Sequence, residues 1–446
     1  MIKDLTHGPP SKAIVSFAVP MVIGNLFQQL YNVVDSIVVG RFVGTGALAA
    51  VGSSFTLMVF ITSILLGLCM GASVVFSQFF GAKNYADLKS TVSTSFIFIG
   101  VTSLVLSIIS IVFVDNIIVF MNIPSELMQD TKDYLLIIFS GIFFTFLYNW
   151  AAGLLRALGN SKTPLCFLII AALTNVVLDL VFVINFKMGI AGAAVATVIA
   201  QLLSAVLCVF YCFKKLDFLR FKLKEITFSR RIFRLTASYS LLTSIQQSVM
   251  NFGILLIQGL VNSFGATTMA AFAAAVKIDS FAYMPVQDFG NAFSTYIAQN
   301  KGAQKQQRIQ EGIKVSVLLI TIFCLAISAA VWLFADKLML IFVHASEAEV
   351  IAIGGHYLRV VSAFYCLIGY LFMFYGLYRG LGNVTMSIVL SVISLGTRVL
   401  LAYTLAPVLK LDGIWWAIPI GWLLADLVGI IYYKKVQIKI PLGGTV

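Results

Sequence analysis

The chain has 446 residues, of which 60% are hydrophobic and only 11% charged, and it carries a formal net charge of +12. Soluble globular domains carry about 25% charged residues, so the composition excludes that class and indicates a protein with many membrane spans. The apolar segments lack the alternation of transmembrane β-strands, which favours helices over a β-barrel.

Twelve apolar segments follow one another along the chain. About 20 apolar residues let a helix cross the hydrocarbon core of a bilayer. The N-terminal segment lacks a cleavage site of small residues, so we expect no removable signal peptide. We expect transmembrane helices over residues 14–40, 47–79, 91–115, 134–157, 163–185, 189–213, 235–263, 268–298, 315–335, 353–378, 386–407 and 413–433.

The positive charge gathers in the loops of one side. With twelve spans, the loops on the side of both termini hold 22 basic and five acidic residues, whereas the other side holds six basic and eight acidic residues. Cytoplasmic loops carry the excess of Lys and Arg, so we expect both termini in the cytoplasm and the chain in the cell (plasma or inner) membrane. The basic run 214–234 is then a cytoplasmic linker near anionic lipid, and we expect no nucleic-acid partner.

The two halves of the chain resemble each other at an offset of about 221 residues. "SQFFGAKNYADLK" aligns with "AQNKGAQKQQRIQ", and "RALGNSKTP" aligns with "RGLGNVTMS". Landmarks that keep their order and offset indicate an internal repeat. The sequence therefore predicts an all-α polytopic membrane protein with twelve transmembrane helices in two pseudo-symmetric six-helix lobes around a central cleft. The N-terminal lobe would span 1–213, the linker 214–234 and the C-terminal lobe 235–446.

Acidic and polar residues interrupt the N-terminal spans. Asp35 is the one charged residue of the run 14–40. Asn175 and Asp179 are four residues apart, so they share one face of a helix. Thr197 lies in the next span. An acid within a membrane span indicates a functional site by default.

The repeat gives this set no acidic counterpart in the other half. Counted from the LGN landmarks, Arg398 stands in place of Asn175 and Ala402 in place of Asp179. The carboxylate, amide and hydroxyl oxygens suit a hard cation and predict an Na⁺ site. Two close carboxylates that cannot both ionise easily would equally exchange a proton. A polar network that only holds helices together is the third alternative, and the sequence leaves all three open.

Further polar residues lie in the C-terminal spans. We expect Met284, Gln287, Asp288 and Arg398 to line a substrate cleft. Lys277 and Asp279 would pair with neighbouring groups, and Asp426, toward the end of the last span, suits a structural role.

Pro20 precedes Asp35 by fifteen residues on the same predicted helix. A bend at this proline would move Asp35 and couple the cation to lobe motion, and a static kink is the alternative.

Nothing in the sequence points to a catalytic residue or a cofactor. The six cysteines lie in apolar spans without metal-ligand spacing, apart from Cys208 and Cys212 one turn apart, and the three histidines form no metal site. An integral-membrane enzyme is therefore disfavoured, and two duplicated lobes favour a carrier over a channel. A flippase for lipid-linked oligosaccharides is a further alternative. It would need a strongly cationic cavity, but the spans hold five acids and only Lys277 and Arg398 as bases.

These landmarks resemble the MATE family, the multidrug and toxic compound extrusion transporters. The stretch "VPMVIGNLFQQLYNVVDSIVVGRFVGTGALAAVG" looks like that family's first-span signature, and the paired "LGN" segments support the resemblance over essentially the whole chain. The DinF-like branch is the most similar. Asp35, Asn175, Asp179 and Thr197 match the N-lobe cation site of that branch, and Tyr31, Pro20 and Tyr134 match residues that support it.

The resemblance implies a secondary active antiporter that works by alternating access. It would export organic, often cationic and amphipathic, compounds in exchange for H⁺ or Na⁺. Its partners would be small organic molecules and membrane lipids, and we expect a monomer. The NorM-like branch carries a glutamate in its seventh span, which this chain lacks, so a C-lobe cation site is not implied.

Overall fold

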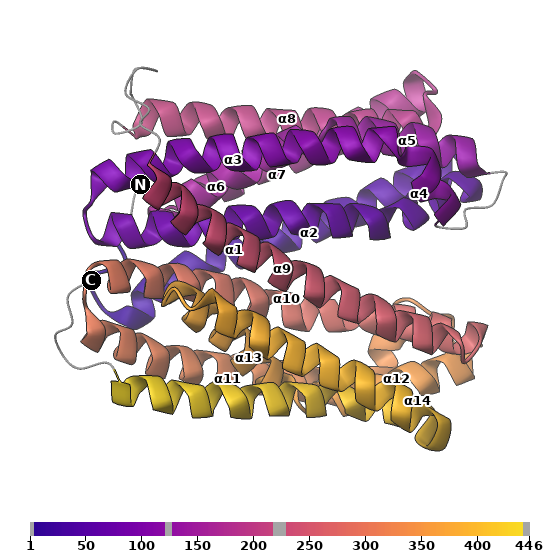
Figure 1. The fold of residues 1–446 in the computed structure, drawn as a ribbon. Coiled ribbons are helices and arrows are strands. Elements are labelled where there is room, and N and C mark those ends of the chain that lie inside the picture. Colours follow the sequence, from indigo (N-terminus) through magenta and orange to yellow (C-terminus); the bar gives the residue numbers. More distant parts are fainter. Residues whose placement is uncertain (1–3, 121–126, 217–228, 440–446) are drawn as a thin grey trace. The chain divides into compact units, whose positions relative to one another are not determined.

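The structure is a computed structural model that describes residues 4–120, 127–216 and 229–439, and these described residues form helices and no strand (Figure 1). The helices are α1 (Pro10–Phe42), α2 (Thr45–Gly81), α3 (Tyr85–Val112), α4 (Val114–Phe120), α5 (Met128–Ser140), α6 (Ile142–Ala157), α7 (Lys162–Asp179), the π-helix η2 (Leu180–Asn185), α8 (Gly189–Lys215), α9 (Arg230–Asn262), α10 (Ala266–Gly302), α11 (Gln306–Met339), α12 (Ala348–Ser362), α13 (Tyr365–Gly380) and α14 (Val384–Lys439).

The predicted all-α fold with twelve spans is confirmed. Nine described helices are long and apolar enough to cross a membrane. Two bent pairs add one span each: α5 with α6, bent by 41°, and α12 with α13, bent by 55°. Non-helical backbone at Lys410 divides the 56 residues of α14 into two spans, which brings the total to twelve.

The chain folds into two compact units. Unit 1 comprises Met1–Gly8, Val15–Ser248 and Ala298–Lys305, and unit 2 comprises Pro9–Ile14, Val249–Ile297 and Gln306–Val446. Helices α9 and α10 thus contribute to both units. The predicted linker 214–234 falls largely on residues outside the described part of the chain, and the lobe boundaries stay a prediction.

Unit 1 is built around α2, which packs against α3, α5 and α6, while α8 packs against α5, α6 and α7. Fully buried Phe76, Phe139 and Phe146 lie in its core. Hydrogen bonds also join its helices, because the Trp150 indole N–H donates to Ser95 Oγ at 3.0 Å. Such bonds hold helices together in lipid, where apolar burial alone gives little preference for one neighbour.

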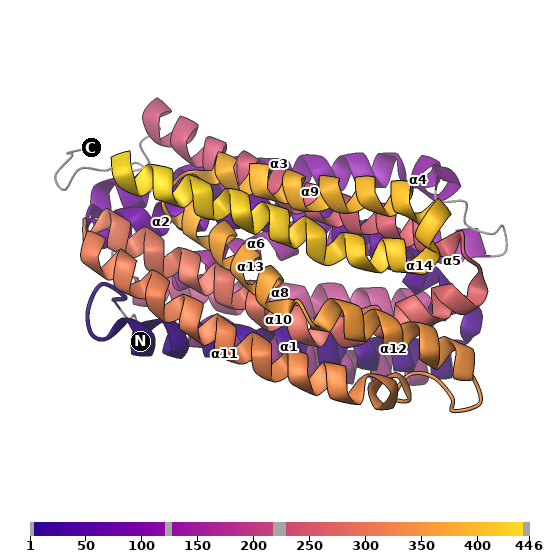
Figure 2. The same cartoon turned by 90° about the horizontal axis from the view of Figure 1, so that it is seen from below.

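In unit 2, α13 packs against α11 and α14, and α11 packs against α12, as the view in Figure 2 also shows. An aromatic group lies buried in this unit. Phe272 stacks on Trp415 with ring centroids 5.5 Å apart, and Tyr357 meets both rings edge-on. The Tyr378 hydroxyl donates to the Gly429 carbonyl at 2.6 Å and joins α13 to α14.

The internal repeat is visible in the helices of the two units. The break at Gly141 between α5 and α6 corresponds to the break at Ala363–Phe364 between α12 and α13, at the 223-residue offset of the LGN segments. The same offset relates Gly153 to Gly376. A Cβ on Gly153 would lie 3.7 Å from the Cys69 carbonyl oxygen, and one on Gly376 would overlap the Gly290 carbonyl. The corresponding helices of the two units, α2 with α6 and α10 with α13, therefore cross at a glycine in both.

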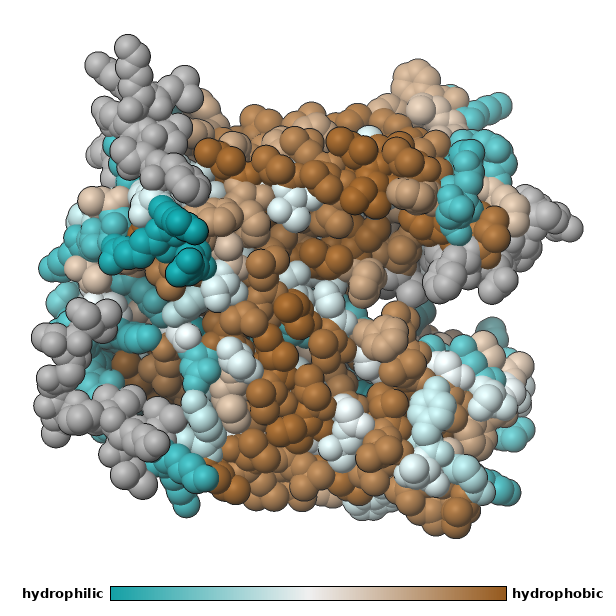
Figure 3. All heavy atoms as spheres, viewed as in Figure 1, coloured by the Kyte–Doolittle hydropathy of each residue, from teal (hydrophilic) through white to brown (hydrophobic). Residues whose placement is uncertain are grey.

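The helix surfaces are apolar where lipid would surround them. Ile97, Val101, Val105 and Ile108 recur at helical spacing along α3, and each is about half exposed. On the face shown in Figure 3, hydrophobic residues cover the middle of the helices and hydrophilic residues gather near the helix ends. This pattern matches helices that cross a bilayer.

Candidate functional site

Helix α1 carries Tyr31 and Asp35 one turn apart, so both side chains share a face of the helix. Asp35 Oδ1 is buried and has no hydrogen-bond partner among the described residues. A buried, unpartnered carboxylate oxygen is costly to keep in an apolar environment. Asp35 therefore needs a proton, a cation or another polar group beside it.

The other half of the site comes from α7 and α8. Asn175 and Asp179 on α7 and Thr197 on α8 are all buried, with exposed fractions of 1%, 0% and 6%. When the Asn175 amide is oriented so that both its ends find partners, its N–H donates to Asp179 Oδ2 at 3.2 Å and its oxygen accepts from the Thr197 backbone N–H at 3.3 Å. The opposite orientation leaves only a 3.4 Å bond to the Thr197 hydroxyl, so the first is favoured.

The carboxyl groups of Asp35 and Asp179 face each other closely enough to share a hydrogen bond. Such a bond requires a proton on one of the two carboxyls. Tyr31 and Tyr134 interact electrostatically with both acids. The structure thus brings together all six residues predicted for the coupling site and its tyrosine support, in unit 1.

We call these six residues the acidic cluster: Tyr31, Asp35, Tyr134, Asn175, Asp179 and Thr197. Within the described residues, no lysine or arginine forms an ion pair with either carboxyl group, and Asp179 Oδ1 also lacks a hydrogen-bond partner. Two acids without a fixed base can hold a shared proton or attract a small cation. Both chemistries that the sequence leaves open fit the residues.

The π-helix η2 begins directly after Asp179. A π-helical turn widens the backbone and interrupts the regular α-helical hydrogen bonds, and such turns are frequent at functional sites. The sequence gives no signal for this turn, because Leu180–Asn185 reads as ordinary apolar helix.

The positions of two predicted features in the fold do not decide their roles. Pro20 is buried inside α1, which is continuous from Pro10 to Phe42. Movement at this proline therefore stays a prediction. Met284, Gln287 and Asp288 are half-buried on α10 in unit 2, and their place on a substrate surface also stays a prediction.

Arg398 is a base within a C-terminal span that could balance an acid of that lobe, and it lies near one. It interacts electrostatically with Asp279, Tyr283 and Tyr357, all in unit 2. Asp279 does find neighbouring groups, as predicted, because the Tyr357 hydroxyl donates to its Oδ2 at 3.3 Å. Lys277 points elsewhere, over the ring of Phe342. The equivalence of Tyr357 to Tyr134 in the repeat was the available signal for this group.

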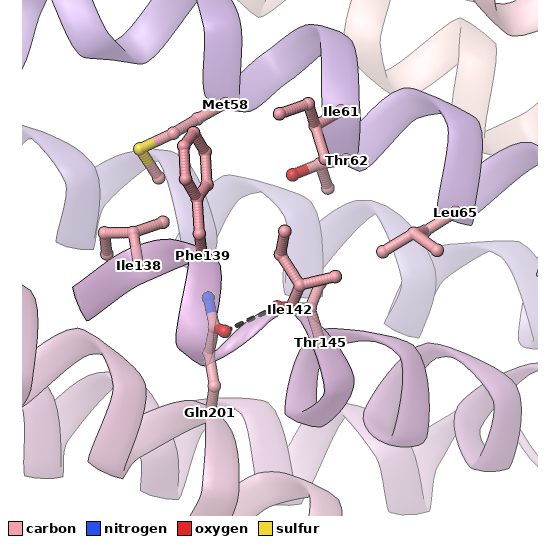
Figure 4. Close-up of a pocket in the computed structure, with 9 residues that line it drawn as sticks. All are labelled: Met58, Ile61, Thr62, Leu65, Ile138, Phe139, Ile142, Thr145 and Gln201. Carbon is pink, nitrogen blue, oxygen red and sulfur yellow. Dashed lines mark hydrogen bonds between the residues drawn. The ribbon is translucent and has the colours of Figure 1, made fainter. Parts of the chain in front are cut away.

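Unit 1 also contains a small cavity at the Gly141 break (Figure 4). Its volume of about 20 Å³ is enough for one water molecule. The Thr145 hydroxyl donates to Gln201 Oε1 at 2.5 Å on one side of it. The remaining lining residues are Met58, Ile61, Thr62, Leu65, Ile138, Phe139 and Ile142.

Among the described residues, the acidic cluster included, no group of three or more His, Cys, Asp and Glu side chains could hold a metal ion. All six cysteines are free thiols. Asp426 is buried, and neither of its carboxyl oxygens has a hydrogen-bond partner among the described residues. It therefore does not join helices through hydrogen bonds.

The comparisons with known proteins agree with this architecture. The MatE family model matches residues 20–181 and 240–404. The chain is 29% identical to the "Probable multidrug resistance protein YpnP" of Bacillus subtilis, over 88% of this chain and 87% of that protein. It is 28% identical to "Probable multidrug resistance protein YoeA" of the same organism, over 95% and 93% of the two chains.

A solved structure described as the outward-facing conformation of a multidrug resistance MATE family transporter of the MOP superfamily has the same fold. The TM-score is 0.91, the sequence identity is 24%, and the match covers 97% of each chain. Because the family model matches well over half of the residues in two blocks, one in each half, the chain belongs to the MATE family of transporters.

Proposed function

We propose that this protein is a secondary active antiporter that exports organic, often cationic and amphipathic, compounds in exchange for H⁺ or Na⁺. The observation that carries the proposal is the acidic cluster, in which Asp35 and Asp179 face each other inside the membrane without a fixed base. Its membership of the MATE family and the multidrug resistance names of its relatives support export of drug-like compounds.

The acidic cluster would couple the two fluxes by exclusion. When a proton or Na⁺ neutralises the cluster, the carboxyl groups no longer attract a cationic compound. When the ion leaves, the negative charge returns and the carrier can load its substrate. For a neutral compound, one elementary charge that moves inward down 100 mV releases about 2.3 kcal/mol, enough to drive export against a gradient of roughly 50-fold. Exchange of one monovalent cation for one H⁺ or Na⁺ moves no net charge, so the concentration gradient of the ion drives it.

The positions of the polar residues also suggest how the affinity for the ion would change during transport. Asn175 is held by the Thr197 backbone and points its amide at Asp179, so the ion-binding oxygens are fixed before the ion arrives. Asp35 lies on a different helix, α1, from Asp179 on α7. A small displacement of α1 would separate the two carboxyl groups and change the affinity for the ion, as alternating access requires.

Ethidium export from proteoliposomes, with a pH gradient and an Na⁺ gradient imposed separately, tests this function. We expect one gradient to drive export and Asp35→Asn to abolish it, because the amide can neither bind the proton nor supply the charge. Asp426→Asn is the matched control, since it changes another buried intramembrane acid outside the cluster. Export that continues unchanged in Asp35→Asn would refute the proposed coupling site.

A further inference from the structure

The repeated glutamine–glycine motif brings the ends of α2 and α10 together within unit 1. The first copy, "SQFFG", holds Gln78 and ends α2 at Gly81. The second copy, "AQNKG", holds Gln299 and ends α10 at Gly302, 221 residues later. A Cβ on Gly81 would overlap the carbonyl of Gln299, and a Cβ on Gly302 would overlap that of Gln78. The two copies of the motif therefore contact each other reciprocally, backbone against backbone.

Residues 4–8, which we call the N-terminal strap, bind to this crossing. Leu5 and Thr6 are buried, with exposed fractions of 0% and 4%. The Leu5 N–H donates to Gln299 Oε1 at 2.9 Å. Lys305 Nζ donates to the Thr6 carbonyl at 2.7 Å and lies 3.3 Å from the Thr6 hydroxyl. Hydrogen bonds from a charged donor are stronger than neutral ones, so Lys305 holds the strap firmly in this state.

The Gln299 side chain joins three parts of the chain. Its Oε1 accepts from the strap, and its Nε2 donates to the carbonyl of Ala157, the last residue of α6, at 2.7 Å. The neighbouring Asn300 amide donates to the Leu5 carbonyl at 3.3 Å. Gln299 and Asn300 are both fully buried. The strap is thus recognised through its backbone, at the N–H and the carbonyl of one residue.

Helix α10 passes from one unit into the other just before this crossing. Residues 249–297 belong to unit 2, and 298–305 belong to unit 1. The helix is continuous to Gly302, and the residues between Gly290 and Gly302 include no proline or glycine at which helices commonly bend. Carriers built from two repeats alternate by movement of one repeat against the other. Such a movement would pull the end of α10 away from the strap.

Helix α1 connects the strap to the acidic cluster. It begins at Pro10, two residues after Gly8, and it carries Asp35 without a break in the helix. Gly8 has a φ of 74°, in the left-handed region that glycine adopts without strain, so the chain turns here from the strap into the helix. A displacement of α1 on ion binding would therefore act on the strap.

We propose that the N-terminal strap is a releasable latch of the transport cycle. In one state it holds the end of α10 against α2 and α6, as seen here, and in the other state it lets the end of α10 go. Gln299 and Lys305 are its positioning residues. The latch rests on the proposed antiport by alternating access and adds the contacts that must break in each cycle.

A reversible cross-link tests whether the latch has to open. Thr6→Cys and Lys305→Cys would be combined in a background in which Cys166 and Cys366, the two cysteines that are not buried, are alanine. A short bis-methanethiosulfonate reagent then joins the two new thiols in proteoliposomes. We expect the cross-link to slow ethidium export by about tenfold or more, and dithiothreitol to restore it, because conformational steps limit transport when they are blocked.

A second cysteine pair is the matched control. Gln307 and Glu311 lie one turn apart on α11, with their side chains 3.1 Å apart, so a cross-link between Gln307→Cys and Glu311→Cys stays within one helix. This cross-link should leave export unchanged. Export that continues at the same rate after the strap has been cross-linked would overturn the proposal, because a static segment need not move.

A labelling measurement decides on the latch even if ethidium is not a substrate. Thr6→Cys alone, in the same background, would react with a membrane-impermeant maleimide in nanodiscs at different pH and Na⁺ concentrations. Its rate is divided by that of the exposed Gln307→Cys, which corrects for the effect of pH on the thiols. We expect the ratio to change by about threefold or more when the ion shifts the populations of the two states. Without ethidium export the proposed function fails, but an ion-dependent ratio supports the latch and a constant ratio overturns it.

Discussion

Asp35 and Asp179 face each other closely enough to share a hydrogen bond, so we expect the two carboxyl groups to act together as one ion-binding unit. Removing either carboxylate destroys the shared site. Groups that act together show strongly non-additive effects when both are removed.

We therefore expect Asp179→Asn to reduce gradient-driven export to the same low residual rate as Asp35→Asn does. The double variant should be no slower than either single variant within about twofold. Initial rates of ethidium export in proteoliposomes of equal protein content measure this. A double variant that loses a further large factor would mean that the two acids serve separate sites.

Asn175 holds Asp179 through its amide, so its loss should loosen the cluster without removing a charge. We expect Asn175→Ala to raise the ion concentration needed for half-maximal export by about tenfold, the usual effect of removing a residue that orients an ion ligand. Thr174→Ala is the control on the same helix, because its hydroxyl is exposed and bonds only to its own helix. Equal ion dependence in both variants would contradict the role given to Asn175.

At this scale the sequence predicts residues better than it predicts contacts. Asp35, Asn175, Asp179 and Thr197 could be named because charged and polar groups are rare in spans and because i, i+4 spacing defines a helix face. The orientation of the Asn175 amide depends on the Thr197 backbone of another helix and leaves no trace in sequence. The charge of Arg398 within a span indicated that it would balance an acid of the C-terminal half, but which acid it meets depends on contacts between distant helices.

Among the helices, small residues decide where close crossings occur. Gly290 on α10 meets the Phe372 carbonyl of α13, because a Cβ there would lie 2.6 Å from that oxygen, and Gly376 and Gly380 face α10 in return. Close approach of backbones at glycine is a common way to pack helices in lipid, where dispersion replaces the hydrophobic effect.

We expect Gly376→Ala to destabilise the protein by about 1–3 kcal/mol, because the added methyl overlaps the Gly290 backbone and the helices must separate. Gly396→Ala on α14 meets no atom within 4 Å and should be neutral or stabilising. Thermal unfolding in detergent measures both. Equal melting temperatures for the two variants would show that this crossing is looser than described.

The spans were predictable because length and hydropathy fix them, but the breaks within them were not. Gly141 and Ala363–Phe364 interrupt two spans without a proline nearby. The π-helix η2 likewise has no local residue signal, because Leu180–Asn185 reads as ordinary apolar helix. The second break places Tyr365 at the start of α13.

For the whole molecule, the repeat relates two units that have kept the same helix crossings and diverged in charge. Unit 1 concentrates two acids, and unit 2 pairs one acid with one base. The repeat and the family could be predicted from the sequence. The compact units could not, because their boundary at Ser248–Val249 falls inside the continuous helix α9, where hydropathy does not change. Assignment to the DinF-like branch stays a prediction.

The central claim is that exit of the compound is coupled to entry of the ion. The most direct test lets the gradient of the compound drive the movement of the ion. Proteoliposomes loaded with ethidium, with no ion gradient, would be diluted into ethidium-free buffer while internal pH and Na⁺ indicators are followed. We predict that ethidium leaving the vesicles draws H⁺ or Na⁺ inward, and that Asp35→Asn abolishes this ion movement whereas Asp426→Asn retains it. Ethidium that leaves at the same rate without ion movement, or ion movement that persists in Asp35→Asn, would contradict the account.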